Sequence, residues 1–194
     1  MKTILVPVDF SDITPLVLVA AASVARAHHG RMVLLHVLHP MVITATHGLP
    51  PDDAAKELTR ERDAADHTLT RHAEMLRARN VEVFTEVREG CCVRSILKVA
   101  EEQAADWIVL GSHGHGAHYH LPAGGTVEGI LREARCPVLV IPPKFRNSRA
   151  RGELEDSAIF PHVSRAERNK PAAAHGLFAN VKGGTHRAPP KAGT

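Results

Sequence analysis

Apolar residues follow two different spacings along the first three-quarters of the chain. Five short segments are apolar almost throughout or at every second position, a pattern typical of β-strands. They span residues 3–8, 32–37, 81–88, 107–111 and 138–142. The segments between them repeat apolar residues every three or four positions, which is the spacing of one helix face. The helices predicted in this way span about residues 11–28, 53–79, 92–104 and 125–134.

This alternation of strands and helices predicts an α/β fold. We expect an open five-stranded parallel sheet, Rossmann-like, with helices on both of its faces. Segment 81–88 alternates apolar and polar residues more strictly than the others, which is typical of an edge strand with one wetter side. Ser11 or Asp12 is expected to cap the start of the first helix, and Gly30 to end that helix.

A glycine-rich loop between the fourth strand and the last predicted helix contains the strongest candidate for binding chemistry. Its glycines are Gly111, Gly114, Gly116, Gly124 and Gly125. Glycine lets the backbone approach an anion closely, and the start of a helix points backbone N–H groups toward it. A strand, a glycine loop and a helix in this order therefore predict a phosphate site.

Composition narrows the class of protein. The 194 residues are 44% hydrophobic and 23% charged, as is ordinary for a globular domain. No apolar run reaches the roughly 20 residues that span a bilayer, and Asp9 comes too early for a signal peptide. We therefore expect a cytoplasmic protein without a membrane segment. Three cysteines do not form a disulfide framework, so we expect small buried or half-buried thiols.

Positive charge is concentrated at the end of the chain. Residues 144–194 hold 10 Lys/Arg and 4 Asp/Glu, a net charge of +6, whereas the whole chain carries +3. We expect two regions: an α/β domain at 1–143 and a basic, largely disordered tail at 144–194. The tail could instead dock on this chain or on a protein partner. Nucleic acid is not an expected partner, because the cations are dispersed and not interleaved with aromatic residues.

Several motifs resemble those of the universal stress protein family. The spacing Gly111-Ser112-His113-Gly114, nine residues, then Gly124-Gly125-Thr126 is similar to the glycine motif of its nucleotide-binding branch. Pro7-Val8-Asp9-Phe10-Ser11 resembles the family's opening, and Leu35-His36-Val37 resembles the end of its second strand. The segments 105–114 and 136–141 resemble its fourth and last strands. The resemblance covers about residues 1–143.

The resemblance implies a strand order of 3-2-1-4-5, a homodimer formed through the last strand, and ATP with magnesium as the ligand. Asp9 would lie near the ribose and the metal, and the Val37 backbone near the adenine. The glycines would surround the phosphates. The nucleotide-contacting residues expected on this basis are Pro7, Asp9, Val37, Gly111, His113, Gly114, His115, Gly124, Gly125 and Thr126.

Two departures from the family pattern bear on function. Gly125 stands where a Ser or Thr is usual, so the hydroxyl contact is lost or displaced to Thr126. His118, Pro122 and Ala123 stand at positions after the second glycine of the motif where the family usually has leucine. We expect an ATP-binding regulator or sensor of the stress response. The alternative is a dimeric scaffold that binds no nucleotide and acts through unknown protein partners. No Walker lysine or other catalytic motif is present, so at most slow ATP hydrolysis is expected.

Two groups of residues admit more than one interpretation. Asp9 is either a functional carboxylate or a turn residue before the first helix. The loop histidines either contact phosphate, bind a transition metal, or are solvated without a role. The expectation is that no metal site is formed. These histidines are His113, His115, His118 and His120.

Overall fold

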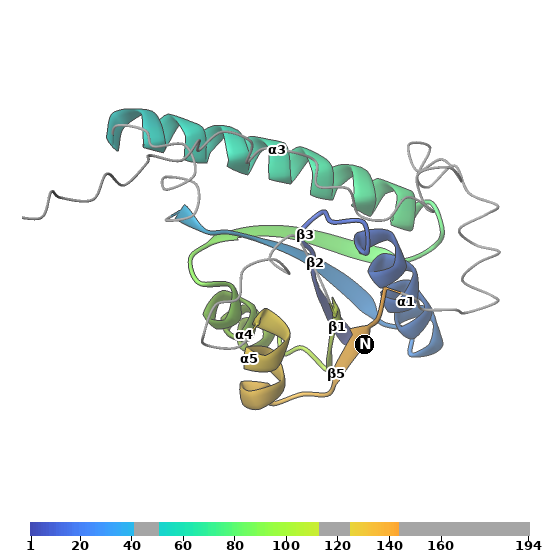
Figure 1. The fold of residues 1–194 in the computed structure, drawn as a ribbon. Coiled ribbons are helices and arrows are strands. Elements are labelled where there is room, and N and C mark those ends of the chain that lie inside the picture. The colour runs from blue at the N-terminus through green and yellow to red at the C-terminus, as the bar shows by residue number, and fades with distance from the viewer. Residues whose placement is uncertain (41–50, 113–124, 144–194) are drawn as a thin grey trace, which may run out of the picture. The chain divides into compact units, whose positions relative to one another are not determined.

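A computed structural model of the chain describes residues 1–40, 51–112 and 125–143 (Figure 1). The strands are β1 (Thr3–Pro7), β2 (Arg31–Leu38), β3 (Glu82–Glu89), β4 (Trp107–Gly111) and β5 (Val138–Ile141). The helices are α1 (Thr14–Ala27), α3 (Pro51–Arg77), α4 (Cys92–Glu102) and α5 (Thr126–Glu133). The predicted elements are confirmed, with ends that agree or differ by at most three residues. All described residues belong to one compact unit.

The five strands form one parallel sheet in the order β3-β2-β1-β4-β5. This confirms the predicted sheet and the implied order. β1 is central because it pairs with both β2 and β4, and helices on both faces leave Ile4, Leu5 and Val6 with no exposed surface. The order reverses between β1 and β4, since the chain moves outward through β2 and β3 and then returns to the other side. In open α/β sheets, ligands bind at the carboxyl ends of the strands beside such a reversal.

The helices cover the two faces of the sheet separately (Figure 1). On one face, α1 and α3 pack over side chains such as Ile4, Val6 and Leu34. On the other face, α4 and α5 pack over Leu5 and Val33. Neighbouring residues of a strand point to opposite faces, so each apolar strand supplies both cores at once.

The two outer strands differ in how their open sides are treated. On β3, the side chain of Arg77 from the end of α3 donates from Nε and Nη2 to the Val83 carbonyl, at 3.0 and 2.5 Å. This occupies a carbonyl that another strand would otherwise use. β3 also leaves Phe84 44% exposed, as expected for a strand with a wetter face. On β5, Val138, Leu139 and Val140 are only half-buried.

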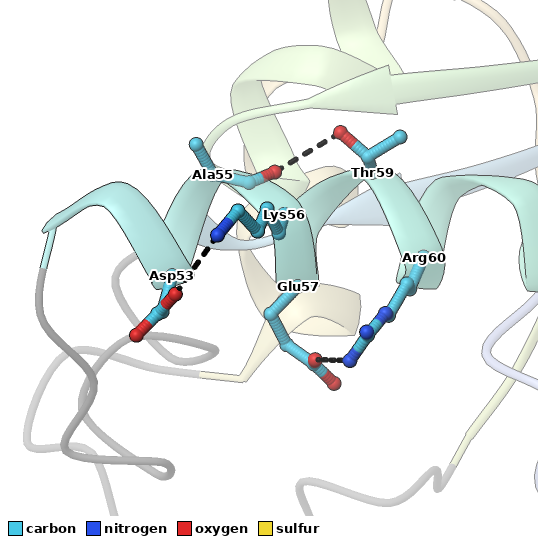
Figure 2. Close-up of polar contacts among 6 residues, drawn as sticks. All are labelled: Asp53, Ala55, Lys56, Glu57, Thr59 and Arg60. Atoms are coloured by element: carbon cyan, nitrogen blue, oxygen red, sulfur yellow. Dashed lines mark hydrogen bonds and ion pairs between the residues drawn. The ribbon is translucent and has the colours of Figure 1, made fainter.

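The start of α3 is held by contacts within the helix. Figure 2 shows Lys56 paired with Asp53 at 3.3 Å and Arg60 paired with Glu57 at 3.4 Å. Exposed pairs of this kind contribute only a few tenths of a kcal/mol each. Farther along α3, an ion pair links the helix to the sheet: Arg62 contacts Glu89 at the end of β3 at 2.6 Å.

The expected ends of α1 need two corrections. The residue at the N-cap is Ile13, which makes no side-chain cap hydrogen bond, so the prediction of Ser11 or Asp12 was wrong. The Ser11 hydroxyl is instead bonded to Asp9. At the other end, His29 rather than Gly30 adopts the left-handed conformation, with φ 49°. Gly30 follows His29 and donates its N–H to the Ala25 carbonyl. This hydrogen bond is the longer one of a Schellman motif, in which the left-handed residue is His29.

No helix among the described residues is long and apolar enough to cross a membrane. The predicted boundary between a domain at 1–143 and a tail at 144–194 stays a prediction, because the tail lies outside the described residues.

Candidate functional site

The turn that follows β1 carries Asp9. Its carboxylate Oδ1 accepts hydrogen bonds from the Ser11 backbone N–H at 3.1 Å and from the Ser11 hydroxyl at 2.5 Å. An Asp that accepts from the residue two positions ahead forms a compact turn. Asp9 is therefore a turn residue, but it does not cap α1. Asp9 also follows the carboxyl end of the central strand, which is where ligands bind in such sheets, so its interpretation as a ligand-binding carboxylate remains a prediction.

A stack of three rings lies beside this turn. Phe10 has φ 59°, in the left-handed region that residues other than glycine rarely adopt. Its ring stacks on His36 of β2, with centroids 4.4 Å apart and an interplanar angle of 20°. On α3, His72 continues the stack, with its ring centroid 6.3 Å from that of Phe10. The stack thus joins the turn to β2 and to α3.

Both histidines of the stack favour the neutral form. Burial is the main cause that lowers the pKa of His36, and it outweighs the opposing hydrogen bond to Val8 and the nearby charges of Asp9 and Glu61. Burial, and secondly Arg71, lowers the pKa of His72 to about 4. His72 is 7% exposed. At neutral pH, neither ring adds a positive charge to this end of the sheet.

Three more of the predicted nucleotide contacts lie at the same end of the sheet as Asp9. Pro7, Val37 and Gly111 are at or near the ends of β1, β2 and β4, which are neighbours in the sheet. Because the strands are parallel, their carboxyl ends meet at one end of the sheet. The chain leaves β4 with the Ser112 N–H donating to the Ile141 carbonyl at 2.8 Å. Pro7, Asp9, Val37 and Gly111 are thereby gathered as the sequence predicted.

The start of α5 contains the last two predicted residues that the structure describes. Gly125 is the N-cap, with extended backbone angles (φ −71°, ψ 170°), and it makes no side-chain cap hydrogen bond. A Cβ added at Gly125 would have no neighbour within 4 Å. Thr126 is the first helical residue and is exposed. The first turn of a helix leaves N–H groups without partners in the helix, so this start can receive an anion.

α4 also starts at this end, after Gly90, whose φ of 135° requires glycine. Cys91 is its N-cap and is exposed, which departs from the expected buried or half-buried thiols. Cys92 is half-buried, and burial raises the pKa of its thiol, with smaller contributions from Cys91 and Asp9. A raised pKa disfavours the reactive thiolate.

Four predicted contacts lie outside the described residues. They are His113, Gly114, His115 and Gly124. Among the described residues, no group of three His, Cys, Asp or Glu side chains could hold a metal ion. The loop histidines 113, 115, 118 and 120, which the metal interpretation concerns, are likewise outside the described part of the chain.

Sequence reasoning assigned no role to two residues that the structure places at the site, Phe10 and His36. Both belong to motifs that carry the family resemblance. A signal was available for His36, because it is the only polar side chain in an otherwise apolar segment, Met32–Leu38. A polar residue in a buried strand requires a hydrogen-bond partner. No sequence signal indicated that Phe10 would stack on it.

Comparisons with known proteins agree on one family. The family model described as "Universal stress protein family" matches residues 1–142. A universal stress protein of Thermus aquaticus is 32% identical over 146 residues, which cover 72% of this chain and 98% of that protein. The solved structure of universal stress protein UspA from Lactobacillus plantarum is 24% identical, with a TM-score of 0.62, and covers 72% of this chain and 97% of that one.

A further solved structure of the same fold contains a nucleotide. It is the universal stress protein from Archaeoglobus fulgidus in complex with dAMP. It is 24% identical to this chain, has a TM-score of 0.51, and covers 73% of this chain and 98% of that one.

Proposed function

Because this chain belongs to the universal stress protein family, we propose that it binds ATP with magnesium and acts as a regulator or sensor of the stress response. The site is the carboxyl end of the sheet around Asp9. No described residue group supplies an activated nucleophile, so the protein is proposed to be no metabolic enzyme, with at most slow ATP hydrolysis. The proposed location is the cytoplasm.

One observation carries this proposal: Asp9, Val37 and Gly111 lie at or just beside the carboxyl ends of three adjacent parallel strands, at the end of the sheet where α5 begins. A carboxylate suits magnesium, and a helix start suits phosphate. The dAMP complex of a neighbour with this fold supports a nucleotide as the ligand class.

Gly125 determines how phosphate would be held at α5. With no side-chain oxygen at the N-cap, the attraction rests on the backbone N–H groups of the first turn and on the helix dipole. Thr126, the first helical residue, is the nearest hydroxyl in sequence. His113, Gly114, His115 and Gly124 complete the proposed contacts from the preceding loop.

The proposal is tested with purified full-length protein. Mass spectrometry of the denatured preparation identifies any co-purified nucleotide, and calorimetric titration with ATP, with and without magnesium, gives the dissociation constant. We expect a dissociation constant below 1 mM that rises when magnesium is omitted. Absence of binding up to millimolar ATP would contradict the proposal.

A second candidate, a dimeric scaffold acting through β5, is favoured by the contrast between the outer strands. The Pro137 and Ile141 carbonyls accept from Ile108 and Ser112, at 3.0 and 2.8 Å, so alternate residues of β5 face β4. The backbone groups of Val138 and Val140 therefore point away from the sheet. Arg77 blocks the corresponding side of β3.

A proline at each outer strand tests the dimer. Val140→Pro removes an outward N–H without breaking the hydrogen bonds to β4. Thr85→Pro is the matched control. The Val83 carbonyl points to the open side of β3, where Arg77 binds it, and Thr85, two residues later, points the same way. We expect light scattering to give twice the chain mass of 21.0 kDa for the parent and the control, and the chain mass for Val140→Pro. A parent protein of one chain mass would overturn the dimer.

The segment 144–194 is proposed to be a basic extension to the domain at 1–143, available to protein partners. Affinity capture of partners with the full chain and with a chain that ends at residue 143 tests this role. Unchanged capture would remove the segment from the scaffold account.

A further inference from the structure

The turn that carries Asp9 is fixed by a side chain from the neighbouring strand. Val8 donates its N–H to the Leu35 carbonyl at 2.8 Å, and its own carbonyl lies 2.8 Å from Nδ1 of His36. A carbonyl oxygen only accepts, so Nδ1 of His36 carries the proton and donates. The residue before Asp9 is thus bonded to β2 through both of its backbone groups.

The residue after Asp9 is held by the same histidine. Phe10 has a left-handed backbone, which is strained for a side chain of its size. Its ring is 4.4 Å from the His36 ring and nearly parallel to it. Aromatic contacts of this geometry are favourable, and they offset part of the backbone strain. His36 therefore acts on both neighbours of Asp9, on one side by a hydrogen bond and on the other by stacking.

We propose that His36 is a positioning residue for nucleotide binding, which sets the Asp9 carboxylate through Val8 and Phe10. The inference rests on the proposed function, because Asp9 is the group that His36 would position. A positioned carboxylate binds a ligand without first losing conformational freedom. Burial keeps His36 largely neutral at pH 7, so its contribution is geometric rather than a charge.

Two substitutions separate the hydrogen bond from the ring. His36→Phe keeps a ring against Phe10 and removes the donor. His36→Asn keeps an amide N–H close to the place of Nδ1 and removes most of the ring. His28→Phe is the matched control, since His28 also stacks on an aromatic residue, Trp107, with centroids 6.0 Å apart, at the opposite end of the sheet.

Calorimetric titration with magnesium and ATP at pH 7.5 is the primary measurement. We expect His36→Phe to raise the dissociation constant about fivefold to tenfold, as loss of one hydrogen bond would. His36→Asn is expected to raise it about threefold, and His28→Phe not at all. In an Asp9→Asn background, His36→Phe should have no further effect, because positioning then has no carboxylate to act on. An equal loss in both backgrounds, or no loss in either, would overturn the proposal.

Amide hydrogen exchange in the absence of nucleotide keeps this inference separate from the proposed function. The Ser11 N–H is bonded to Asp9 Oδ1, so its exchange reports whether the carboxylate stays in place. We expect about tenfold faster exchange of this amide in His36→Phe and an unchanged rate in His28→Phe. If the parent protein binds no nucleotide, the proposed function fails, and this rate alone decides the positioning role. An unchanged Ser11 rate in His36→Phe would contradict it.

Discussion

The two ends of the sheet differ in how the starts and ends of their elements are bonded. At the amino end, Asp106 accepts from the Lys2 ammonium at 2.7 Å and from the Thr3 N–H at 2.8 Å, and its own N–H donates to the Thr3 carbonyl. The Lys2 contact is the main cause that lowers the pKa of Asp106. At the carboxyl end, α4 and α5 start from Cys91 and Gly125, which make no side-chain cap hydrogen bond.

This contrast indicates that the amino end of the sheet contributes mainly to stability and the carboxyl end mainly to ligand binding. At the amino end, the Asp106 carboxylate is paired within the chain by Lys2 and the Thr3 N–H, although the Lys2–Asp106 pair is partly exposed to solvent. Helix starts without side-chain caps leave N–H groups to water or to an anion. We therefore expect substitutions at the amino end to change the free energy of unfolding, and substitutions at the carboxyl end to change nucleotide affinity.

The largest expected effect is a loss of stability on adding a methyl group at Gly30, compared with the same change at Gly125. A Cβ at Gly30 would lie 2.6 Å from the Lys2 carbonyl oxygen, which belongs to the backbone and cannot rotate away. We expect Gly30→Ala to lower the free energy of unfolding by about 2–3 kcal/mol in urea denaturation. Gly125→Ala, which meets nothing within 4 Å, should cost less than about 1 kcal/mol. Equal losses of stability at the two positions would show that Gly30 is not more tightly packed than Gly125.

Acid should destabilise the protein through the carboxyl-end ring stack. The folded protein keeps His72 neutral down to about pH 4, while the unfolded chain protonates it near its ordinary value of 6.5. Between these values the unfolded state binds more protons, so stability falls as pH falls. The expected loss from this group is about 2 kcal/mol between pH 7 and pH 5.

Denaturation at both pH values tests this dependence. His72→Phe keeps a ring beside Phe10 and should remove most of the difference. A smaller loss of the same sign should remain from His36, whose pKa is also lowered. A His72→Phe variant with the full pH dependence of the parent would show that another group is responsible.

Removing one carboxylate at each end tests the division of function directly. We expect Asp9→Asn to raise the dissociation constant for magnesium ATP at least tenfold, because a charged contact contributes about 1.5–3 kcal/mol. Asp106→Asn is the control and should leave affinity unchanged, while weakening the Lys2 contact. Calorimetry measures both. A comparable loss of affinity in Asp106→Asn would mean that the two ends are not independent.

The smallest expected effect is a gain. Gly125→Ser returns a hydroxyl to the position where the family resemblance expects one, and the extended backbone and open space there accept it. We expect about threefold tighter ATP binding, within the range of one weak hydrogen bond. Gly125→Ala adds the Cβ without the hydroxyl and should bring no gain. Tighter binding by both variants would assign the effect to the backbone instead.

Several features of the site required the structure. The sequence predicted Asp9, Val37 and Gly111 as neighbours because parallel strands bring their carboxyl ends together. It did not predict that the Ser11 hydroxyl would bond to Asp9 instead of capping α1, so the cap prediction was wrong. Two local hydrogen bonds competed for one hydroxyl, and sequence spacing does not rank them.

The sequence by itself determined the sheet, its helices and the end at which ligands are expected, because apolar spacing and glycine positions are local properties of the chain. Only the tertiary structure decided which side chains support Asp9. Phe10, His36 and His72 are far apart in sequence, and their stacking depends on how β1, β2 and α3 pack. Strand and helix periodicity fixes which face a residue occupies, whereas contacts between rings depend on the packing of whole elements.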